Sequence, residues 1–356
     1  MKAIRLPVLP NSPVAIGSNS VEGDFSLQSF GEFEFVQNAL FDEALIRYGQ
    51  NYQNDQSQSG FFLRHMNEVY SLIKAKCSKG DRLVEIGCGK GAFLEIVKAD
   101  GFFQYAGYDT AYEGNDENIE PRYLDEDDRI EADVVVLRHT LEHVKAPHLF
   151  LNQLKRVFGD EALVFIEVPQ LDWIAKYKVL FDFTYEHVNY FSSKSLSALF
   201  SENLERADIF GGQYQFCFAR LGALDVDGWT GFDRAENWRE FNFDDYLDAF
   251  AQSVEFLRHH KRLWVWGGAT KGVLFLKHLA DVEPAIFHKV VGVVDINEKK
   301  QSLHTPSTYV PILSPSEMAR KADKSDFVIV MNPNYEDEVG EQLSRLACAA
   351  VRIGSI

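Results

Sequence analysis

The sequence predicts an α/β protein made of two units, each built around a mostly parallel β-sheet. Two observations lead to this fold class. Short apolar segments of strand length alternate with helical segments from residue 81 onward, which is typical of βαβ units and a parallel sheet. The same alternation begins again near residue 261, after an acidic and aromatic stretch. A length of 356 residues is sufficient for two or three domains, each with its own core.

The first unit is expected to contain a sheet that ends in a hairpin. Strands are predicted at 82–86, 103–108, 133–138 and 162–168, with helices from about 90 and at 147–157. A further helix is predicted near 193–204, with Ser193 as its cap. The segments 206–210 and 213–221 are joined by Gly211-Gly212, which indicates an antiparallel hairpin closing the sheet.

Four segments follow from this pattern. We assign residues 1–60 to an N-terminal segment that packs on the next domain, 61–224 to the first α/β domain, 225–260 to a helical connector and 261–356 to the second, smaller domain. In the second domain we predict strands at 263–266, 290–294 and 327–331, a glycine turn at 267–272 and a helix at 273–279.

Composition excludes several classes of protein. Lys plus Arg total 36 against 53 for Asp plus Glu, and a net charge of −17 repels phosphate backbones and anionic membrane surfaces, so we expect no nucleic-acid partner. The four cysteines form no C-x-x-C pair, which argues against a disulfide framework and a cysteine-ligated zinc site. No apolar run has the length of a signal peptide core or a membrane span, so we expect a cytoplasmic protein.

The stretch Glu85–Gly91 is a glycine loop between a predicted strand and a predicted helix. Gly87, Gly89 and Gly91 allow the backbone to approach a ligand closely. Two of these glycines, with Ala92, also satisfy the dinucleotide pattern G-x-G-x-x-A. The carboxylate of Glu85 suits a cationic group, such as the α-amino group of S-adenosylmethionine, and would have no favourable interaction with a pyrophosphate. The loop therefore favours S-adenosylmethionine over a dinucleotide.

Three more residues are expected at the same edge of the sheet. Asp109 ends the second predicted strand, where a carboxylate can accept hydrogen bonds from both ribose hydroxyls. Arg138 and His139 follow the third strand and should face the cofactor, although a structural role is an equal alternative for both. The pentapeptide His139–His143 matches H-x-x-E-H, a zinc motif that requires one helix. Because it directly follows a buried strand, we predict a strand-to-helix turn and no metal.

The segment Phe181–Phe191 is the candidate catalytic segment, since it places ionisable and phenolic groups among large aromatic side chains. Such surroundings shift the pKa of a histidine and exclude water, and neutral His187 is a suitable general base near pH 7. The alternative is a packed aromatic loop with a hydrogen-bonded histidine. Tyr48 and Tyr52, in the polar stretch 46–60, are candidate substrate contacts.

Four passages make the chain resemble the NDP-sugar C-methyltransferases over about residues 45–350. They are Glu85–Gly91, Glu186-His187 followed by Tyr190-Phe191-Ser192, Trp266–Gly272, and Val294–Gln301 running to Val310-Pro311-Ile312. The first passage is shared by class I methyltransferases in general, whereas the last two occur together in few other contexts. The resemblance implies a class I methyltransferase fold, with a Rossmann-like sheet closed by an antiparallel hairpin, followed by a smaller Rossmann-like domain.

The resemblance also implies a reaction. S-adenosylmethionine would methylate carbon 3 of a nucleotide-linked 4-keto-deoxysugar, with His187 as the base that forms the enolate. Glu186 would orient the imidazole, and Tyr185 or Tyr190 would donate a hydrogen bond to the enolate oxygen. Alternatives are a sugar O-methyltransferase, an NAD-dependent oxidoreductase and a binding module without turnover. The sugar, the nucleotide base and the oligomeric state are left open.

The sequence departs from the family at several points. No cysteine precedes Cys77, whereas the family has an N-terminal zinc module, so we expect a metal-free N-terminal segment. The family's Tyr-Asp-Glu-His appears here as Thr184-Tyr185-Glu186-His187. Its Trp-Asn pair appears as Met331-Asn332, which makes Asn332 a candidate substrate contact. Lys271, in the second glycine turn, is a candidate contact for substrate phosphate.

Overall fold

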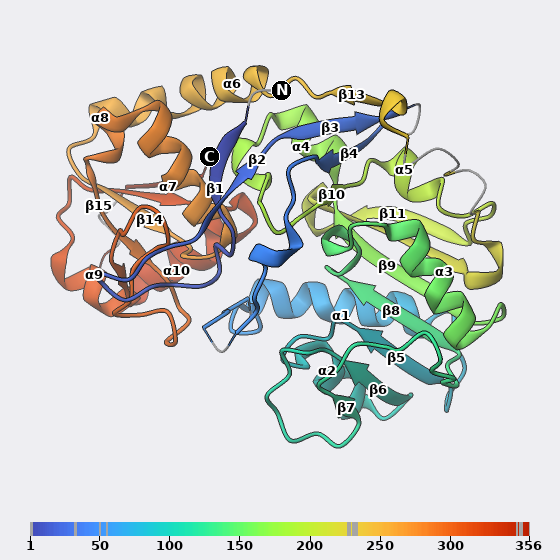
Figure 1. Cartoon of the computed structure of the whole chain (residues 1–356). Coiled ribbons are helices and arrows are strands. Elements are labelled where there is room, and N and C mark those ends of the chain that lie inside the picture. The colour runs from blue at the N-terminus through green and yellow to red at the C-terminus, as the bar shows by residue number, and fades with distance from the viewer. Residues whose placement is uncertain are drawn as a thin grey trace.

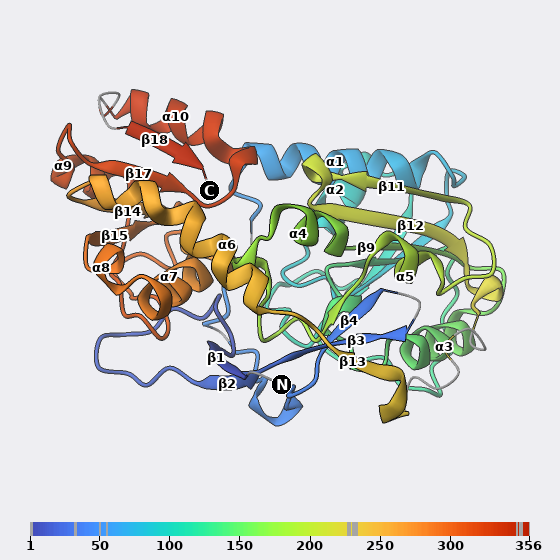
Figure 2. The same ribbon diagram turned by 90° about the horizontal axis from the view of Figure 1, so that it is seen from above.

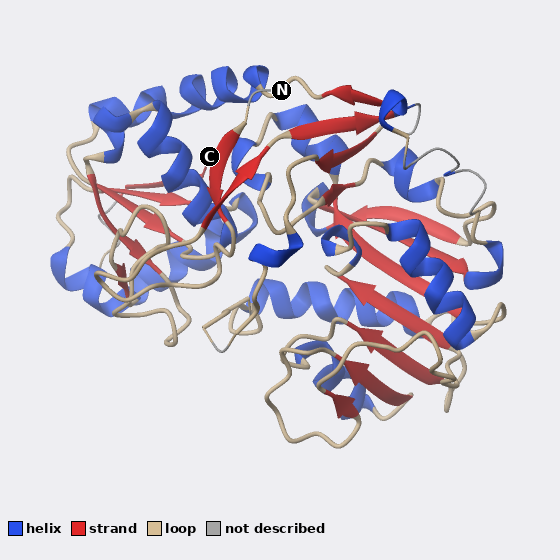
Figure 3. Cartoon of the chain, viewed as in Figure 1, coloured by secondary structure: helices blue, strands red, loops and turns tan. Residues whose placement is uncertain are grey.

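The computed structural model describes residues 3–31, 34–49, 51–54, 56–225, 229, 234–346, 348 and 352–355. Parts of the predicted N-terminal segment and connector lie outside these ranges. Two α/β units lie side by side, with the larger sheet on the right of Figure 1 and the smaller on the left. Figure 3 shows that helices accompany the strands of both sheets. Among the described residues, no helix combines the length and apolar character needed to cross a membrane.

In the part of the chain that the structure describes, the larger sheet has seven strands in the order β11-β12-β9-β8-β5-β6-β7. Its parallel strands are β5 (Arg82–Ile86), β6 (Gln104–Tyr108), β7 (Ile119–Glu120), β8 (Val134–Arg138) and β9 (Leu163–Pro169). The last two strands, β11 (Glu205–Ile209) and β12 (Tyr214–Arg220), form an antiparallel hairpin, and β12 pairs antiparallel with β9. The predicted sheet with its closing hairpin is therefore confirmed.

Helices cover both faces of this sheet (Figure 2). The helices of the unit are α1 (Gly60–Lys74), α2 (Ala92–Asp100), α3 (Pro147–Phe158), α4 (Leu171–Tyr177) and α5 (Ser193–Ser197). Alternate residues of β8 face opposite sides, so Val134 packs in the same cluster as α1 and α2, and Val135 in the cluster that contains α3. The predicted cap of α5 was wrong by one residue, because Ser192 forms the capping box with Ser195.

The smaller sheet has five parallel strands in the order β16-β15-β14-β17-β18, which confirms a second Rossmann-like unit. The strands are β14 (Leu263–Trp266), β15 (Val290–Val294), β16 (Ile312–Leu313), β17 (Phe327–Val330) and β18 (Arg352–Ser355). The helices are α6 (Asp244–Val254), which precedes the sheet, α7 (Thr270–Val282), α8 (Pro284–Phe287), α9 (Pro315–Lys321) and α10 (Glu336–Arg345).

The N-terminal segment contributes strands that contact both units. β1 (Ile4–Pro7) pairs with β2 (Glu22–Phe25), while β3 (Leu27–Phe30) and β4 (Phe35–Asn38) join a sheet of order β10-β4-β3-β13 with β10 (Asn189–Tyr190) and β13 (Trp238–Glu240). On the side of the smaller unit, Val14 forms a β-bridge with His304, and Asn11 donates a hydrogen bond to Thr270 over 2.7 Å. The segment therefore joins the two units as well as packing on the larger one.

Short 3₁₀ turns complete the described structure. They are η2 (Glu43–Leu45), η3 (Leu141–His143), η4 (Leu180–Asp182), η5 (Phe210–Gly212), η6 (Leu221–Ala223), η8 (Ala235–Asn237), η9 (Glu255–His259) and η10 (Pro333–Tyr335). The candidate catalytic segment begins within η4, and His143 of η3 contacts its Glu186 backbone oxygen. One apolar cluster extends from Phe183 of that segment to Phe275 of α7, so the segment lies where the two units meet.

Candidate active site

The glycine loop runs from the end of β5 into α2, as the sequence predicted. Gly87, Gly89 and Gly91 have φ angles of 76°, 56° and 81°, a left-handed region that side chains other than glycine rarely adopt. A β-carbon at Gly87 would lie 2.3 Å from Thr140 Oγ1. The loop therefore needs glycine for its conformation as well as for the approach of a ligand.

Glu85 is the penultimate residue of β5, directly before this loop, and is only 2% exposed. Its Oε1 lies 3.9 Å from Arg138 Nη1, and its Oε2 receives no hydrogen bond from the described residues. Burial raises the pKa of Glu85 to about 7, although Arg138 acts in the opposite direction. A buried carboxylate with an unused oxygen fits a ligand that brings its own positive charge, as the α-amino group of S-adenosylmethionine does.

Asp109 follows β6 and holds the glycine loop in place. Its Oδ2 accepts a hydrogen bond from Gly89 N and its Oδ1 accepts one from Ala111 N, both over 2.7 Å. The carboxylate therefore fixes the loop that approaches the ligand. Each carboxylate oxygen keeps a further lone pair that could accept a hydrogen bond from a ribose hydroxyl. The contact with the ribose stays a prediction.

A buried cluster of charges lies beneath the site, centred on Glu167 of β9. This carboxylate is fully buried and lies 2.5 Å from His65 Nε2, 2.9 Å from Arg138 Nε and 3.6 Å from His139 Nε2. Burial opposes its ionisation, but Arg138 and His139 outweigh burial and hold the pKa of Glu167 well below its usual value. Burial likewise lowers the pKa of His139, yet Glu167 and Glu142 outweigh it and raise that pKa to about 9. Arg138 and His139 thus have structural partners.

The H-x-x-E-H pentapeptide does not form a helix. His139 follows β8 with a φ of 49°, and the turn η3 begins at Leu141. Its two histidines have different partners: His139 lies beside Glu167, whereas His143 Nδ1 lies 2.8 Å from the backbone oxygen of Glu186. The predicted turn after the strand is therefore confirmed.

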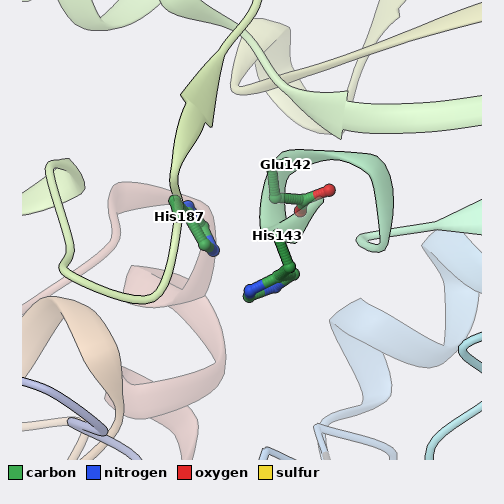
Figure 4. A group of neighbouring side chains, drawn as sticks. All are labelled: Glu142, His143 and His187. Carbon is green, nitrogen blue, oxygen red and sulfur yellow. The ribbon is translucent and has the colours of Figure 1, made fainter. Parts of the chain in front are cut away.

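His187, within the candidate catalytic segment, lies beside His143 (Figure 4). The ring centroids are 4.8 Å apart and the ring planes are nearly perpendicular, at 86°. Burial lowers the pKa of His187 well below its usual value, and the nearby His143, His139 and Lys271 add to this effect. His187 is therefore a neutral imidazole at physiological pH, as a general base must be.

Glu186 connects this pair to the N-terminal segment. Its side chain is 2% exposed, its Oε2 accepts a hydrogen bond from the Tyr52 hydroxyl over 2.8 Å, and burial raises its pKa. The rings of Tyr48 and Tyr52 lie 4.8 Å apart, and the Tyr48 hydroxyl lies 3.4 Å from His143 Nδ1. Both tyrosines are thus brought to the histidine pair. Glu186 holds Tyr52 and, through its backbone, His143, whereas we expected it to orient the His187 imidazole.

Tyr185 and Tyr190 have places different from those we expected. The Tyr185 hydroxyl accepts a hydrogen bond from Asp42 N over 2.9 Å. The Tyr190 hydroxyl both accepts from Thr184 N and donates to Thr184 O, each over 2.9 Å. Backbone groups thus engage both hydroxyls, although the Tyr190 ring lies near His187, with 6.3 Å between the ring centroids.

Lys271 and Asn332, the two candidates from the smaller unit, contact the larger unit. Lys271 Nζ forms an ion pair with Asp182 of η4. The Asn332 side chain exchanges two hydrogen bonds with Gln213, over 2.8 and 2.9 Å. The polar groups of both side chains are used in contacts between the two units. Their predicted contacts with substrate therefore gain no support. A polar cleft of about 620 Å³ lies between the units, lined by Pro13, Asn51, Gln53, Glu113, Lys299 and Leu303.

Sequence reasoning singled out neither His65 nor Glu167, and it treated His143 only as part of the zinc motif. Two local signals were present. His65 interrupts the apolar face of α1, and Glu167 stands alone among the apolar residues of β9. A charge inside an otherwise apolar strand indicates a buried partner, because an unpaired buried charge is costly. Identifying that partner required the fold.

Comparison with known proteins gives matches over most of the chain. Residues 62–203 match the methyltransferase domain family, and residues 227–353 match the C-methyltransferase C-terminal domain family, so the two domains implied by the resemblance are confirmed. C-methyltransferase NovU of Streptomyces niveus is 26% identical over 327 residues, which cover 81% of this chain and 76% of NovU.

Solved structures with similar folds include two SAM-dependent methyltransferases. The one from Aquifex aeolicus is 15% identical, with a TM-score of 0.35, and the match covers 48% of this chain and 100% of that one. The one from Archaeoglobus fulgidus is 18% identical, with a TM-score of 0.30, and the match covers 46% of this chain and 100% of that one.

Proposed function

Because this chain is an S-adenosylmethionine-dependent methyltransferase that carries the C-terminal domain of C-methyltransferases, we propose that it methylates a carbon of a nucleotide-linked 4-keto-deoxysugar with His187 as the general base. The observation that carries the proposal is the neutral imidazole of His187 beside His143, in a segment next to the carboxyl edge of the larger sheet. The C-methyltransferase activity named for NovU supports the reaction type.

The chemistry needs one proton transfer before the methyl transfer. A 4-ketone acidifies the C–H bond next to it, and His187 takes that proton, leaving an enolate whose carbon carries the electron pair. When bound, S-adenosylmethionine would supply the electrophilic methyl group that this carbon takes up, with S-adenosylhomocysteine as the leaving group. The chain's own contribution is the placement of the base, the shielding of the site by aromatic side chains and the carboxylate of Glu85 for the donor's ammonium group.

The contacts around His187 hold it in position. His143 donates its Nδ1–H to the Glu186 carbonyl over 2.8 Å, which leaves Nε2 unprotonated in a neutral ring. Tyr52 fixes the Glu186 side chain from the N-terminal segment, and β10 fixes the following residues by pairing Asn189 with Gln37. The segment that carries the base is therefore held on both sides, as near-attack positioning requires.

The test separates base catalysis from a structural role. His187→Asn should lower turnover by roughly 10²–10⁴-fold, the usual contribution of a positioned general base, with little change in the affinity for S-adenosylhomocysteine measured by calorimetry. The exposed His288 provides a control, and His288→Asn should keep wild-type turnover. Near-normal turnover in His187→Asn, or equal losses of turnover and cofactor affinity, would remove His187 from the mechanism.

Isotope exchange tests the site of methylation. With a nucleoside-diphosphate-linked 4-keto-deoxysugar in deuterated water and no methyl donor, the wild-type enzyme should introduce deuterium next to the ketone. His187→Asn should lose this exchange. Methylation of the same sugar without any exchange would favour the O-methyltransferase alternative.

A further inference from the structure

Three side chains with metal-binding atoms, one of them the candidate base His187, lie close together. Glu142 and His143 belong to η3, and His187 belongs to the segment before β10, so the group combines two distant parts of the chain (Figure 4). One carboxylate oxygen and one ring nitrogen from each histidine all lie within 4.8 Å of one another. The group shares Glu142 and His143 with the zinc-like pentapeptide, but His187 stands in place of His139.

Glu142 is the part of this group that the proposed reaction leaves unexplained. Its side chain is 1% exposed, and neither carboxylate oxygen receives a hydrogen bond from a described residue. His139 Nδ1 lies 3.5 Å from Oε1, an ion-pair distance at which no hydrogen bond forms. This pair offsets part of the cost of burying the carboxylate, but both oxygens keep lone pairs that accept no hydrogen bond from a described residue.

The two histidines also have unused nitrogen lone pairs. His143 uses Nδ1–H toward the Glu186 carbonyl, which leaves the lone pair on Nε2, and His187 Nδ1 has no hydrogen-bond partner among the described residues. Two imidazoles and one carboxylate, all with free electron pairs, form a donor set that suits divalent transition metals such as zinc, with coordination positions left open. His139 lies outside the set because its ring nitrogens face Glu142 and Glu167.

We propose that Glu142, His143 and His187 together bind one divalent transition metal ion, and that the bound ion inhibits methyl transfer. Metal–ligand distances of about 2.0–2.2 Å require the three side chains to close on the ion by small rotations. The ion then occupies a nitrogen lone pair of His187, so this ring no longer accepts the substrate proton. The inhibition rests on the proposed role of His187 as the base, whereas the binding does not.

Metal binding is tested directly on the full chain, purified with a chelator and saturated with S-adenosylhomocysteine. Calorimetry with Zn²⁺ and visible absorption with Co²⁺ should show one ion per chain, with nitrogen and oxygen ligands. Glu142→Gln, which keeps the shape of the side chain, and His143→Asn should each weaken the affinity by about tenfold or more. The control His288→Asn should bind like the wild type. Absence of stoichiometric binding, or equal affinity in Glu142→Gln, would overturn the site.

Inhibition is tested in the methyl-transfer assay. Zn²⁺ should inhibit the wild type, excess chelator should restore turnover, and Glu142→Gln should need about tenfold or more Zn²⁺ for the same fractional inhibition. Turnover that requires the metal would overturn the inhibitory role. If the ion binds but His187→Asn retains turnover, the proposed base is wrong while the metal site stands, so the two failures are distinguishable.

Discussion

Glu85 should make the chain less stable in the absence of cofactor, and Glu85→Gln tests this. The folded protein raises the pKa of this carboxyl from 4.5 to about 7, so between these pH values the folded chain binds more protons than the unfolded chain. Stability therefore falls as pH rises through this window, and the full cost persists above it. The difference between the two pKa values corresponds to about 3 kcal/mol of the free energy of unfolding. This is an upper value for the gain in Glu85→Gln, because the glutamine side chain still has to be buried.

The assay compares thermal unfolding of the wild type and Glu85→Gln without cofactor, from pH 5 to pH 8. Glutamine has the same shape but no charge, so the variant should unfold at a higher temperature at pH 8, and the difference should shrink toward pH 5. Midpoints are compared at equal scan rates, since a two-domain chain need not unfold in two states. If the unfolding midpoints of the two proteins changed in parallel with pH, the reasoning would be refuted.

The same substitution should have the opposite effect on ligand binding. Removing the charge partner of the ligand's ammonium group should weaken S-adenosylhomocysteine binding by roughly 1–3 kcal/mol, or about 5- to 150-fold, at pH 8. Wild-type affinity should also decline as pH falls through about 7, where Glu85 becomes protonated, while the affinity of the variant changes less. A variant that is more stable and also binds the ligand as well as the wild type would exclude the carboxylate from the cofactor site.

Two further predictions concern the contacts between the units. Lys271→Met and Asp182→Asn each break a partly buried ion pair. A double-mutant cycle on the free energy of unfolding in urea should give a coupling energy of about 1 kcal/mol between the two residues. Additive effects of the two substitutions would show that the pair contributes nothing to stability. Asn332→Ala leaves the buried amide of Gln213 without its partner and should lower the free energy of unfolding by about 1–3 kcal/mol. The double variant Asn332→Ala with Gln213→Ala should lose less than the sum of the two single variants. A loss below experimental error in Asn332→Ala would contradict this.

The strands of the two Rossmann-like sheets could be predicted closely because their signals are local. The predicted strands 82–86 and 263–266 coincide with β5 and β14, and both are short, mostly apolar segments followed by glycine turns. The strands β3 and β4 left no such signal. They pair with β13 and β10, which lie more than 140 residues further along the chain, and strand formation there depends on those partners more than on intrinsic preference.

The candidate site divides in the same way. The glycine loop and Glu85 form one contiguous motif, so the sequence alone places them together. The phenolic groups of Tyr185 and Tyr190 are close to His187 in sequence, but their directions depend on backbone partners at Asp42 and Thr184. Composition thus indicated a candidate segment without indicating which groups its hydroxyls bind.

The candidate catalytic segment is held by both the smaller unit and the N-terminal segment. Asp182, before the base, is held by Lys271 of α7, and β10, after the base, is paired with β4. The carboxylate and glycine loop expected to hold the cofactor lie entirely within the larger unit, in β5 and the turn that follows it. We therefore expect cofactor binding to depend on the larger unit alone, and the placement of His187 to depend on three parts of the chain folding together.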